Sequence, residues 1–126
     1  MDWHISDIET ESIENTDFRR VLFTGKHSQL VLMSLKPGEE IGSEVHPDND
    51  QFFRVESGIG TVVVDGEEQP IGDGTAIVVP AGAEHNVINE SDDEDLKLYT
   101  IYSPAHHPKG TVHHTKKEAE AAEEKK

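Results

Sequence analysis

Short apolar runs of strand length follow one another from Arg19 to Tyr102, and glycine, proline, asparagine or aspartate separates each run from the next. The runs are rich in valine, isoleucine, phenylalanine and tyrosine: RRVLFT, QLVLMSLK, IGSEVH, QFFRVES, IGTVVVD, TAIVVP, HNVINES and DLKLYTIY. The pair Asp65-Gly66 is a typical tight-turn signal between two such segments. Because no helical segment separates the runs, they predict an all-β, antiparallel sandwich or barrel.

The two ends of the chain have a different character. Residues 1–18 are polar without a sustained period, so we expect an N-terminal arm that lies against the body. Residues 19–103 are expected to form the barrel. Residues 104–126 contain a histidine-bearing loop and then KKEAEAAEEKK, which favours a helix by composition. Because so short a helix is marginal in water, we expect a frayed and solvated C-terminal helical tail.

The formal net charge of −15 narrows the classes of partner. Nucleic acid and anionic membrane both require a basic face, so neither is expected as a partner. The only arginines are Arg19, Arg20 and Arg54, which disfavours a polyphosphate held by an arginine cluster. We therefore expect a small-molecule ligand or substrate. A salt-rich cytoplasm, in which salt screens self-repulsion, is one origin of an acidic protein of this kind.

Length and cysteine content add two further limits. The 126 residues suffice for one domain with a modest core. The absence of cysteine excludes a disulfide framework, a thiolate metal site and a cysteine nucleophile. No run is long enough for a transmembrane helix, and the opening MDWHISDIETES is acidic, unlike a secretory signal. These features predict a cytoplasmic protein.

Two stretches carry the candidate chemistry: residues 37–60, PGEEIGSEVHPDNDQFFRVESGIG, and residues 72–89, GDGTAIVVPAGAEHNVIN. Residues two apart in a strand point to the same side, so Glu44 and His46 project together. If the strands of the two stretches are adjacent in a barrel, four possible metal ligands can converge on one point: Glu44, His46, Gln51 and His85.

The second stretch resembles a motif of the cupin family. That motif runs glycine, five residues, Pro-x-Gly, two residues, histidine, three residues, asparagine. The chain matches it in full with Gly74, Pro80, Gly82, His85 and Asn89.

The first stretch is similar to the other cupin motif, which has glycines at both ends of a His-x-His and glutamate set. Gly38, His46 and Gly58 fit its spacing. Glu44 stands where the family has its first histidine, and Gln51 stands where it has glutamate.

The resemblance covers roughly residues 20–102 and implies an antiparallel double-stranded β-helix, or jelly-roll barrel. The chain most resembles the acidic small cupins that are grouped loosely with mannose-6-phosphate isomerase. Small cupins commonly pair through their outer sheets, so the apolar run QLVLMSL leads us to expect a homodimer.

The two departures from the family pattern keep the charge of the ligand set. Three imidazoles and one carboxylate bring one negative charge to a metal, and Glu44, His46, Gln51 and His85 also bring one. Two histidines and one carboxylate support Fe(II) oxygen chemistry or zinc-water chemistry. We therefore expect a divalent metal ion, with Fe, Mn and Zn not distinguished. The alternative is that these side chains hydrogen-bond to one another inside the barrel without a metal.

Further residues are candidates to line the pocket: Phe53, Tyr99, Tyr102 and His107. The two tyrosines differ in parity along the strand, so only one of them faces inward. A second histidine group, His106, His107, His113 and His114, either forms a solvated loop, folds across the barrel mouth, or binds a second metal.

Three functions remain open at this stage. The first is a metal-dependent enzyme, isomerase-like or epimerase-like, that acts on a sugar-like or enolisable carbonyl compound. The second is an Fe(II)-dependent dioxygenase that uses a two-histidine, one-carboxylate site. The third is a non-catalytic barrel that binds a small ligand. A fold alone does not choose among them.

Overall fold

The structure, a computed structural model, describes residues 1–124. Its strands are β1 (Arg19–Thr24), β2 (Gln29–Leu35), β3 (Glu44–Val45), β4 (Asp50–Ser57), β5 (Ile59–Val64), β6 (Glu67–Gly72), β7 (Ala76–Val79), β8 (Glu84–Asn89), β9 (Leu96–Ser103) and β10 (Val112–His113), and its helices are α1 (Ile8–Glu14) and α2 (Lys116–Glu124). Neither helix of the described chain is long and apolar enough to cross a membrane.

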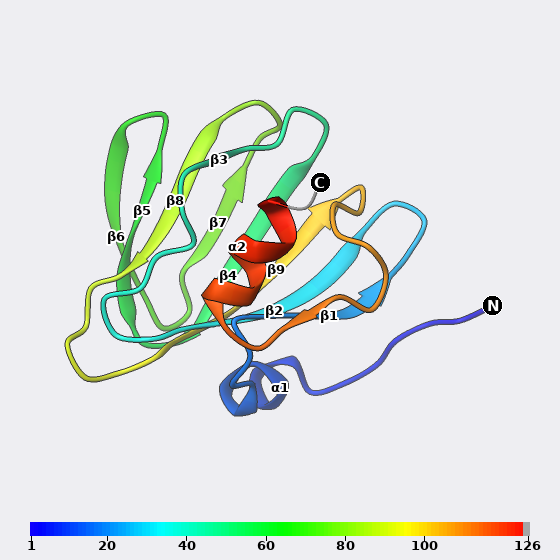
Figure 1. The fold of residues 1–126 in the computed structure, drawn as a ribbon, viewed down its shortest axis with the longest axis horizontal. Coiled ribbons are helices and arrows are strands. Elements are labelled where there is room, and N and C mark those ends of the chain that lie inside the picture. Colours follow the sequence, from blue (N-terminus) through cyan, green and yellow to red (C-terminus); the bar gives the residue numbers. More distant parts are fainter. Residues whose placement is uncertain (125–126) are drawn as a thin grey trace.

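Two antiparallel sheets pack against each other (Figure 1). The larger has the strand order β10-β1-β2-β9-β4-β7, and the smaller has the order β3-β8-β5-β6. This arrangement confirms the predicted all-β jelly-roll barrel with a short C-terminal helix. The run IGSEVH contributes less strand than expected, because only Glu44 and Val45 of it form the strand β3, although the Ile41 amide also donates to Val87 O of β8.

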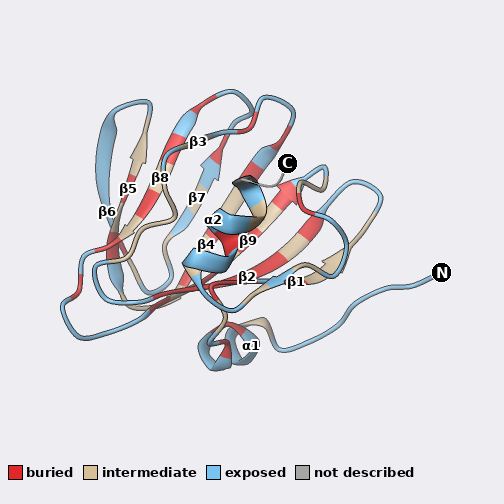
Figure 2. Cartoon of the chain, viewed as in Figure 1, coloured by how far each residue is buried: buried red, intermediate tan, exposed pale blue. Residues whose placement is uncertain are grey.

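The core lies between the inner faces of the two sheets, and Figure 2 shows buried positions alternating with less buried ones along the strands. In β9 the even-numbered residues from Leu96 to Tyr102 are buried, and the odd-numbered ones are not. Phe53 and Val55 of β4 and Val87 of β8 meet them from other strands. The strand therefore has the period of two that the sequence predicts, and the structure shows that Tyr102, not Tyr99, is on the buried face.

The turn between β5 and β6 is the one that Asp65-Gly66 predicts. Both residues have positive φ, 48° and 83°. A two-residue turn with positive φ at both positions matches the twist of the hairpin strands, which explains the choice of an Asp-Gly pair.

The N-terminal arm contains a helix that the sequence reading did not predict. Asp7 caps α1 by accepting a hydrogen bond from the Thr10 amide at 3.0 Å. The helix lies against the outer face of the larger sheet, where Leu32 is buried (Figures 1 and 2). Lys97 holds the C-terminal end of α1 to the sheet, because its ammonium group donates to Asn15 O and to Ser34 Oγ. This is part of the face that QLVLMSL offers for pairing, and the homodimer stays a prediction.

The C-terminal tail is helical as expected, but it is not simply solvated. Thr115 and Glu118 form a capping box, since each accepts a hydrogen bond from the backbone amide of the other. Ala119 of α2 is 4% exposed and belongs to the core cluster. The chain also adds β10 to β1 ahead of this helix. The tail is therefore packed on the barrel, and Figure 1 shows α2 in front of β4 and β9.

His114 ties the tail to the N-terminal arm, because its Nδ1 lies 2.6 Å from Asp17 Oδ1. The hydrogen bond and charge of Asp17 raise the pKa of His114 above its ordinary 6.5. Burial acts to raise the pKa of Asp17, but the bonds and charges of His114 and Arg20 hold it below 3.8. Because the pKa of His114 is higher in the folded state, its protonated form stabilises the fold. This stabilisation is fully present below pH 6.5 and is lost as the pH rises through the pKa of the folded state.

We expect this ion pair to contribute most between pH 3.8 and pH 6.5, the ordinary values of the two groups. It is lost at higher pH as His114 deprotonates, and at lower pH as Asp17 is protonated. Melting temperatures of wild type and His114→Asn, measured from pH 3 to 9, should therefore differ in that window and converge above it. A difference that grows toward pH 9 would contradict this assignment.

Candidate functional site

The four predicted ligands come together between the two sheets. Glu44 of β3 pairs in register with His85 of β8, both in the smaller sheet. His46 follows β3 directly, and Gln51 reaches in from β4 of the larger sheet. The bends that bring them here depend on glycines with positive φ, of which Gly82 precedes β8.

Glu44 and His46 form the first pair of this site. His46 is 5% exposed, and its Nε2 lies 2.9 Å from Glu44 Oε2. The nitrogen is fully buried, yet the geometry of this contact does not make a hydrogen bond. Burial acts to raise the pKa of Glu44, but the contact with His46 and the charges of His46, Arg19 and His85 hold it below 4.5. Glu44 is therefore an ionised carboxylate at neutral pH.

Gln51 and His85 form the second pair. His85 Nε2 lies 3.0 Å from Gln51 Oε1, and His85 Nδ1 lies 3.2 Å from the backbone oxygen of Ala83. The Gln51 amide nitrogen donates to Thr100 Oγ1 at 3.0 Å. Burial lowers the pKa of His85, despite the hydrogen bond to Ala83, so the imidazole is neutral near pH 7 and carries one N–H.

A neutral His85 with two oxygen neighbours can donate to only one of them. If Nδ1–H donates to Ala83, two lone pairs face each other across the 3.0 Å between Nε2 and Gln51 Oε1. A cation bound to both atoms would remove this conflict. Two changes would remove it without a cation: turning the Gln51 amide over, or placing the His85 proton on Nε2 so that it donates to Gln51 Oε1. Metal content therefore distinguishes the cation-bound arrangement from these two.

The donor set fits a divalent metal in chemistry. It offers two imidazole nitrogens, one carboxylate and one amide oxygen. The buried Nε2 of His46 is a further sign, because its 2.9 Å contact with Glu44 Oε2 lacks hydrogen-bond geometry. Within residues 1–124 no three histidine, aspartate or glutamate side chains form a ready-made metal cage. The donors instead lie as two pairs, with the rings of His46 and His85 5.3 Å apart.

The candidate pocket residues separate into two groups. Phe53 lies beside the site with its ring 5.9 Å from that of His85, and Tyr102 lies 5.6 Å from His46. Tyr102 is the tyrosine that faces inward, and burial raises the pKa of its hydroxyl. Tyr99 lies on the opposite face of β9 beside Phe52, so it was wrongly included among the pocket residues.

The histidine-bearing loop reaches the site. The ring of His106 lies 4.2 Å from that of His46 and stacks on Tyr102. His107 is buried, and its Nε2 lies 3.3 Å from the Tyr102 hydroxyl. His113 lies instead beside β1, and His114 binds Asp17. Of the alternatives open from sequence, the structure favours a loop at the barrel mouth.

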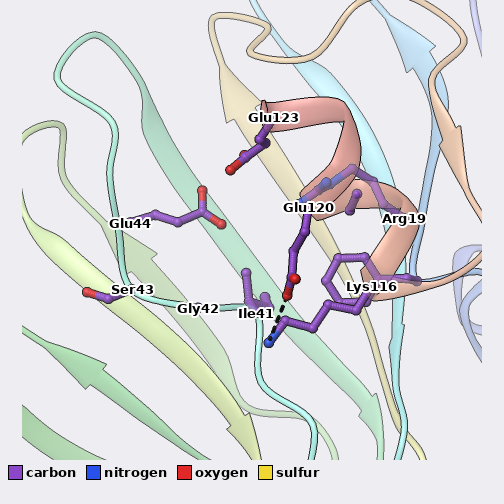
Figure 3. Close-up of a pocket in the computed structure, with 10 residues that line it drawn as sticks. Arg19, Ile41, Gly42, Ser43, Glu44, Lys116, Glu120 and Glu123 are labelled. Atoms are coloured by element: carbon purple, nitrogen blue, oxygen red, sulfur yellow. Dashed lines mark ion pairs between the residues drawn. The ribbon is translucent and has the colours of Figure 1, made fainter. Parts of the chain in front are cut away.

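A cavity of about 220 Å³ opens beside Glu44, beneath α2 (Figure 3). Ten residues line it: Phe18, Arg19, Ile41, Gly42, Ser43, Glu44, Lys116, Ala119, Glu120 and Glu123. Glu123 also lines the adjoining hollow that contains Glu44, His46 and His106. Sequence reasoning missed the contributions of Arg19 and α2 to this cavity. Arg19 shares its face of β1 with Val21, which was a readable signal of an inward position.

Comparison with known proteins identifies the family. Residues 31–102 match the cupin domain model. The chain belongs to the cupin family. This result confirms the resemblance of the two motifs at the level of the superfamily. The subgroup named after mannose-6-phosphate isomerase is not distinguished by it.

The relatives of this cupin include proteins without a stated activity. The uncharacterized Bacillus subtilis protein YrkC is 48% identical over 126 residues, which cover 95% of this chain and 67% of YrkC. The crystal structure of BH2720 from Bacillus halodurans superposes with a TM-score of 0.91 at 47% identity, covering 94% of this chain and 93% of the other. The Streptomyces cyaneus protein named polyketide synthase CurC is 30% identical over 90 residues, 71% of this chain and 57% of CurC.

Proposed function

We propose that this cupin binds one divalent metal ion through Glu44, His46, Gln51 and His85 and is an enzyme that acts on a small oxygenated molecule. One observation carries the proposal. Two pairs of possible ligand atoms lie between the sheets, Glu44 Oε2 with His46 Nε2 at 2.9 Å and Gln51 Oε1 with His85 Nε2 at 3.0 Å. A single cation is the simplest group that satisfies all four.

A divalent ion in this position would polarise a carbonyl or hydroxyl oxygen of the substrate. The chain supplies the surroundings for such chemistry. Phe53 and Tyr102 wall the site and exclude water, and His106 holds the His46 ring from the side. Isomerisation or epimerisation of a sugar-like or enolisable carbonyl compound fits these parts. The scarcity of arginine argues against a phosphorylated sugar.

The second candidate is an Fe(II)-dependent dioxygenase. The observation in its favour is that Glu44, His46 and His85 supply two histidines and one carboxylate, the set common in non-haem Fe(II) oxygenases. Oxygen uptake by the Fe(II) form that is absent from the Zn form would favour this candidate over the isomerase-like one. Ligand binding without turnover of any substrate would favour a third candidate, a binding protein.

Metal stoichiometry is the direct test of the proposed function. Protein purified without oxygen, and protein refolded with Fe(II), Mn(II) or Zn(II), should contain about one metal ion per chain by elemental analysis. A screen of small sugars, keto acids and phenols for thermal stabilisation then narrows the substrate. Protein that contains no stoichiometric metal under any of these conditions would defeat the proposal and support a metal-free arrangement of Gln51 and His85.

A further inference from the structure

Arg19 is a buried cation that lines the cavity beside Glu44 and that the proposed function does not use. Its side chain points inward from β1 and is 3% exposed, whereas neighbouring Arg20 is exposed and binds Asp17. Its Nη1 lies 3.3 Å from His113 Nδ1, and the Phe18 ring lies 5.3 Å from the guanidinium carbon. Its Nε is buried and has no hydrogen-bond partner.

Among residues 1–123, whose side chains the structure describes, no carboxylate lies within ion-pair distance of this guanidinium. The charge of Arg19 acts on Glu44 and helps to hold the pKa of that carboxyl down, but the guanidinium makes no ion pair in direct contact. Its buried Nε–H also lacks an acceptor, which is unfavourable. The chain carries 26 aspartate and glutamate residues, so a carboxylate partner for Arg19 was readily available to it. An anion that comes from outside the chain would meet both requirements.

The cavity connects Arg19 with the candidate metal site. Arg19 and Glu44 both line it, from β1 and from β3, with α2 along its rim (Figure 3). Its volume of about 220 Å³ is small beside the roughly 300–1,000 Å³ of pockets that hold drug-sized ligands. A ligand that reaches from Arg19 to the Glu44 end is therefore a molecule of few heavy atoms.

We propose that Arg19 binds the carboxylate of a small organic acid whose other oxygen is held at the Glu44, His46, Gln51 and His85 site. The substrate class is then a hydroxy acid or a keto acid. This inference rests on the proposed function, because it needs the metal site as the second point of attachment. One guanidinium matches one carboxylate, with two parallel N–H···O bonds that would include the orphaned Nε.

The charges around the cavity make this binding conditional on the metal. Three carboxylates line the cavity, those of Glu44, Glu120 and Glu123, against the cations Arg19 and Lys116. Lys116 is already engaged, with its Nζ 3.9 Å from Glu120 Oε1. Without a metal the lining therefore repels an anion, and a bound divalent ion reverses the sign of its net charge. We expect the acid to bind the metal-loaded protein and not the metal-free protein.

Arginine side-chain NMR tests this inference directly, because the chain has only three arginines to resolve. The Nε–Hε signals of the Zn-loaded protein are followed during titration with pyruvate and with 4-hydroxybutanoate, which differ in the spacing of their oxygens. Hydroxyacetone and 1,4-butanediol serve as neutral partners of the same chain lengths. The Arg19 signal should move with at least one acid and with neither neutral compound. The signals of Arg20 and Arg54 serve as internal controls and should stay in place.

The two proposals fail in different ways in this experiment. Calorimetry that detects no Zn binding overturns the proposed function and this inference together. Stoichiometric Zn binding with an Arg19 signal that is indifferent to both acids overturns this inference alone. A signal that moves equally with acids and neutral compounds also overturns it, because recognition of the carboxylate is then absent.

Variants give an independent readout. Arg19→Met should weaken binding of the acid roughly tenfold or more, the loss expected for a hydrogen bond to a charged group. It should leave the affinities for Zn and for the neutral compound unchanged. Arg20→Met is the matched control and should change none of the three. If Arg19→Met does not fold by circular dichroism, Arg19→Lys takes its place. Lysine keeps the charge without the planar fork, so a smaller but selective loss for the acid is expected, and an equal loss for both ligands overturns the inference.

Discussion

Glu44→Ala is expected to abolish stoichiometric metal binding, the largest effect of any single change at the site. Glu44 is the only carboxylate among the four donors, so its loss removes the whole negative charge of the ligand set. Loss of a hydrogen-bond partner outside the ligand shell already costs roughly 10–100-fold in metal affinity, so loss of this ligand should cost about 100-fold or more. Calorimetric titration with Zn(II) measures it, with elemental analysis as the second readout.

Two control variants show whether the loss comes from coordination. Gln51→Ala removes a neutral oxygen donor and should weaken binding without abolishing it. Glu40→Ala removes a carboxylate that accepts a hydrogen bond from Asn86 outside the donor set, and it should leave Zn affinity unchanged. If Glu44→Ala binds Zn as tightly as wild type, the two donor pairs are a hydrogen-bonded interior and not a metal site.

Asn89→Ala is expected to destabilise the fold by about 3 kcal/mol or more, a large part of the stability of a domain of this size. Asn89 is 1% exposed. Its amide nitrogen donates to three backbone oxygens, those of Leu35 (3.0 Å), Lys36 (3.1 Å) and Glu94 (2.9 Å). Its Oδ1 accepts from the Ser91 amide at 2.9 Å. Alanine leaves all of these buried groups without the partner that ties three segments together.

Urea denaturation of Asn89→Ala should show a lower midpoint with an unchanged slope, the signature of lost stability without a change in exposed surface. Asn86→Ala, three residues earlier in β8, is the matched control. Asn86 is half-buried and makes two such bonds, to Glu40 and from the Gly42 amide, so its loss should cost about 1 kcal/mol. Equal midpoints for the two variants would show that the Asn89 side chain does not hold these three segments together.

His85 and Asn89 show what the cupin motif predicts and what it leaves open. His85 and Asn89 belong to the same motif, and spacing alone gives them equal weight. In the structure His85 faces the candidate metal site, whereas Asn89 holds backbone at the other end of β8. The sequence could locate both residues because strand period and turn glycines fix their positions. It could not assign their roles, because those depend on which distant backbone each meets.

The sequence also predicts which residues of a strand share a face. It does not predict which of the two faces points into the barrel. One of Tyr99 and Tyr102 had to face inward, and the choice depended on the register of β9 against β4, in which Gln51 lies opposite Tyr102. The same reasoning applied to β1 would have placed Arg19 beside Val21 on the inner face.

The two short helices were harder to predict for a physical reason. Neither is long enough to be stable alone, so composition predicted α2 but not α1, and it did not predict where either helix packs. The capping box formed by Thr115 and Glu118 is a signal that was present in the sequence, and it fixes the start of α2. The site that Ala119 packs against is set by the barrel, and no local pattern encodes it.

The donors of the candidate site belong to different sheets, since Glu44 and His85 lie in the smaller one and Gln51 in the larger. An ion bound by all of these donors would cross-link the two sheets. The two sheets would then separate less often. Backbone amide hydrogens in both sheets would exchange with solvent more slowly when the metal is bound than when it is absent. A cell short of that metal would hold a looser, more protease-sensitive version of the same barrel, so that its abundance would itself report the metal.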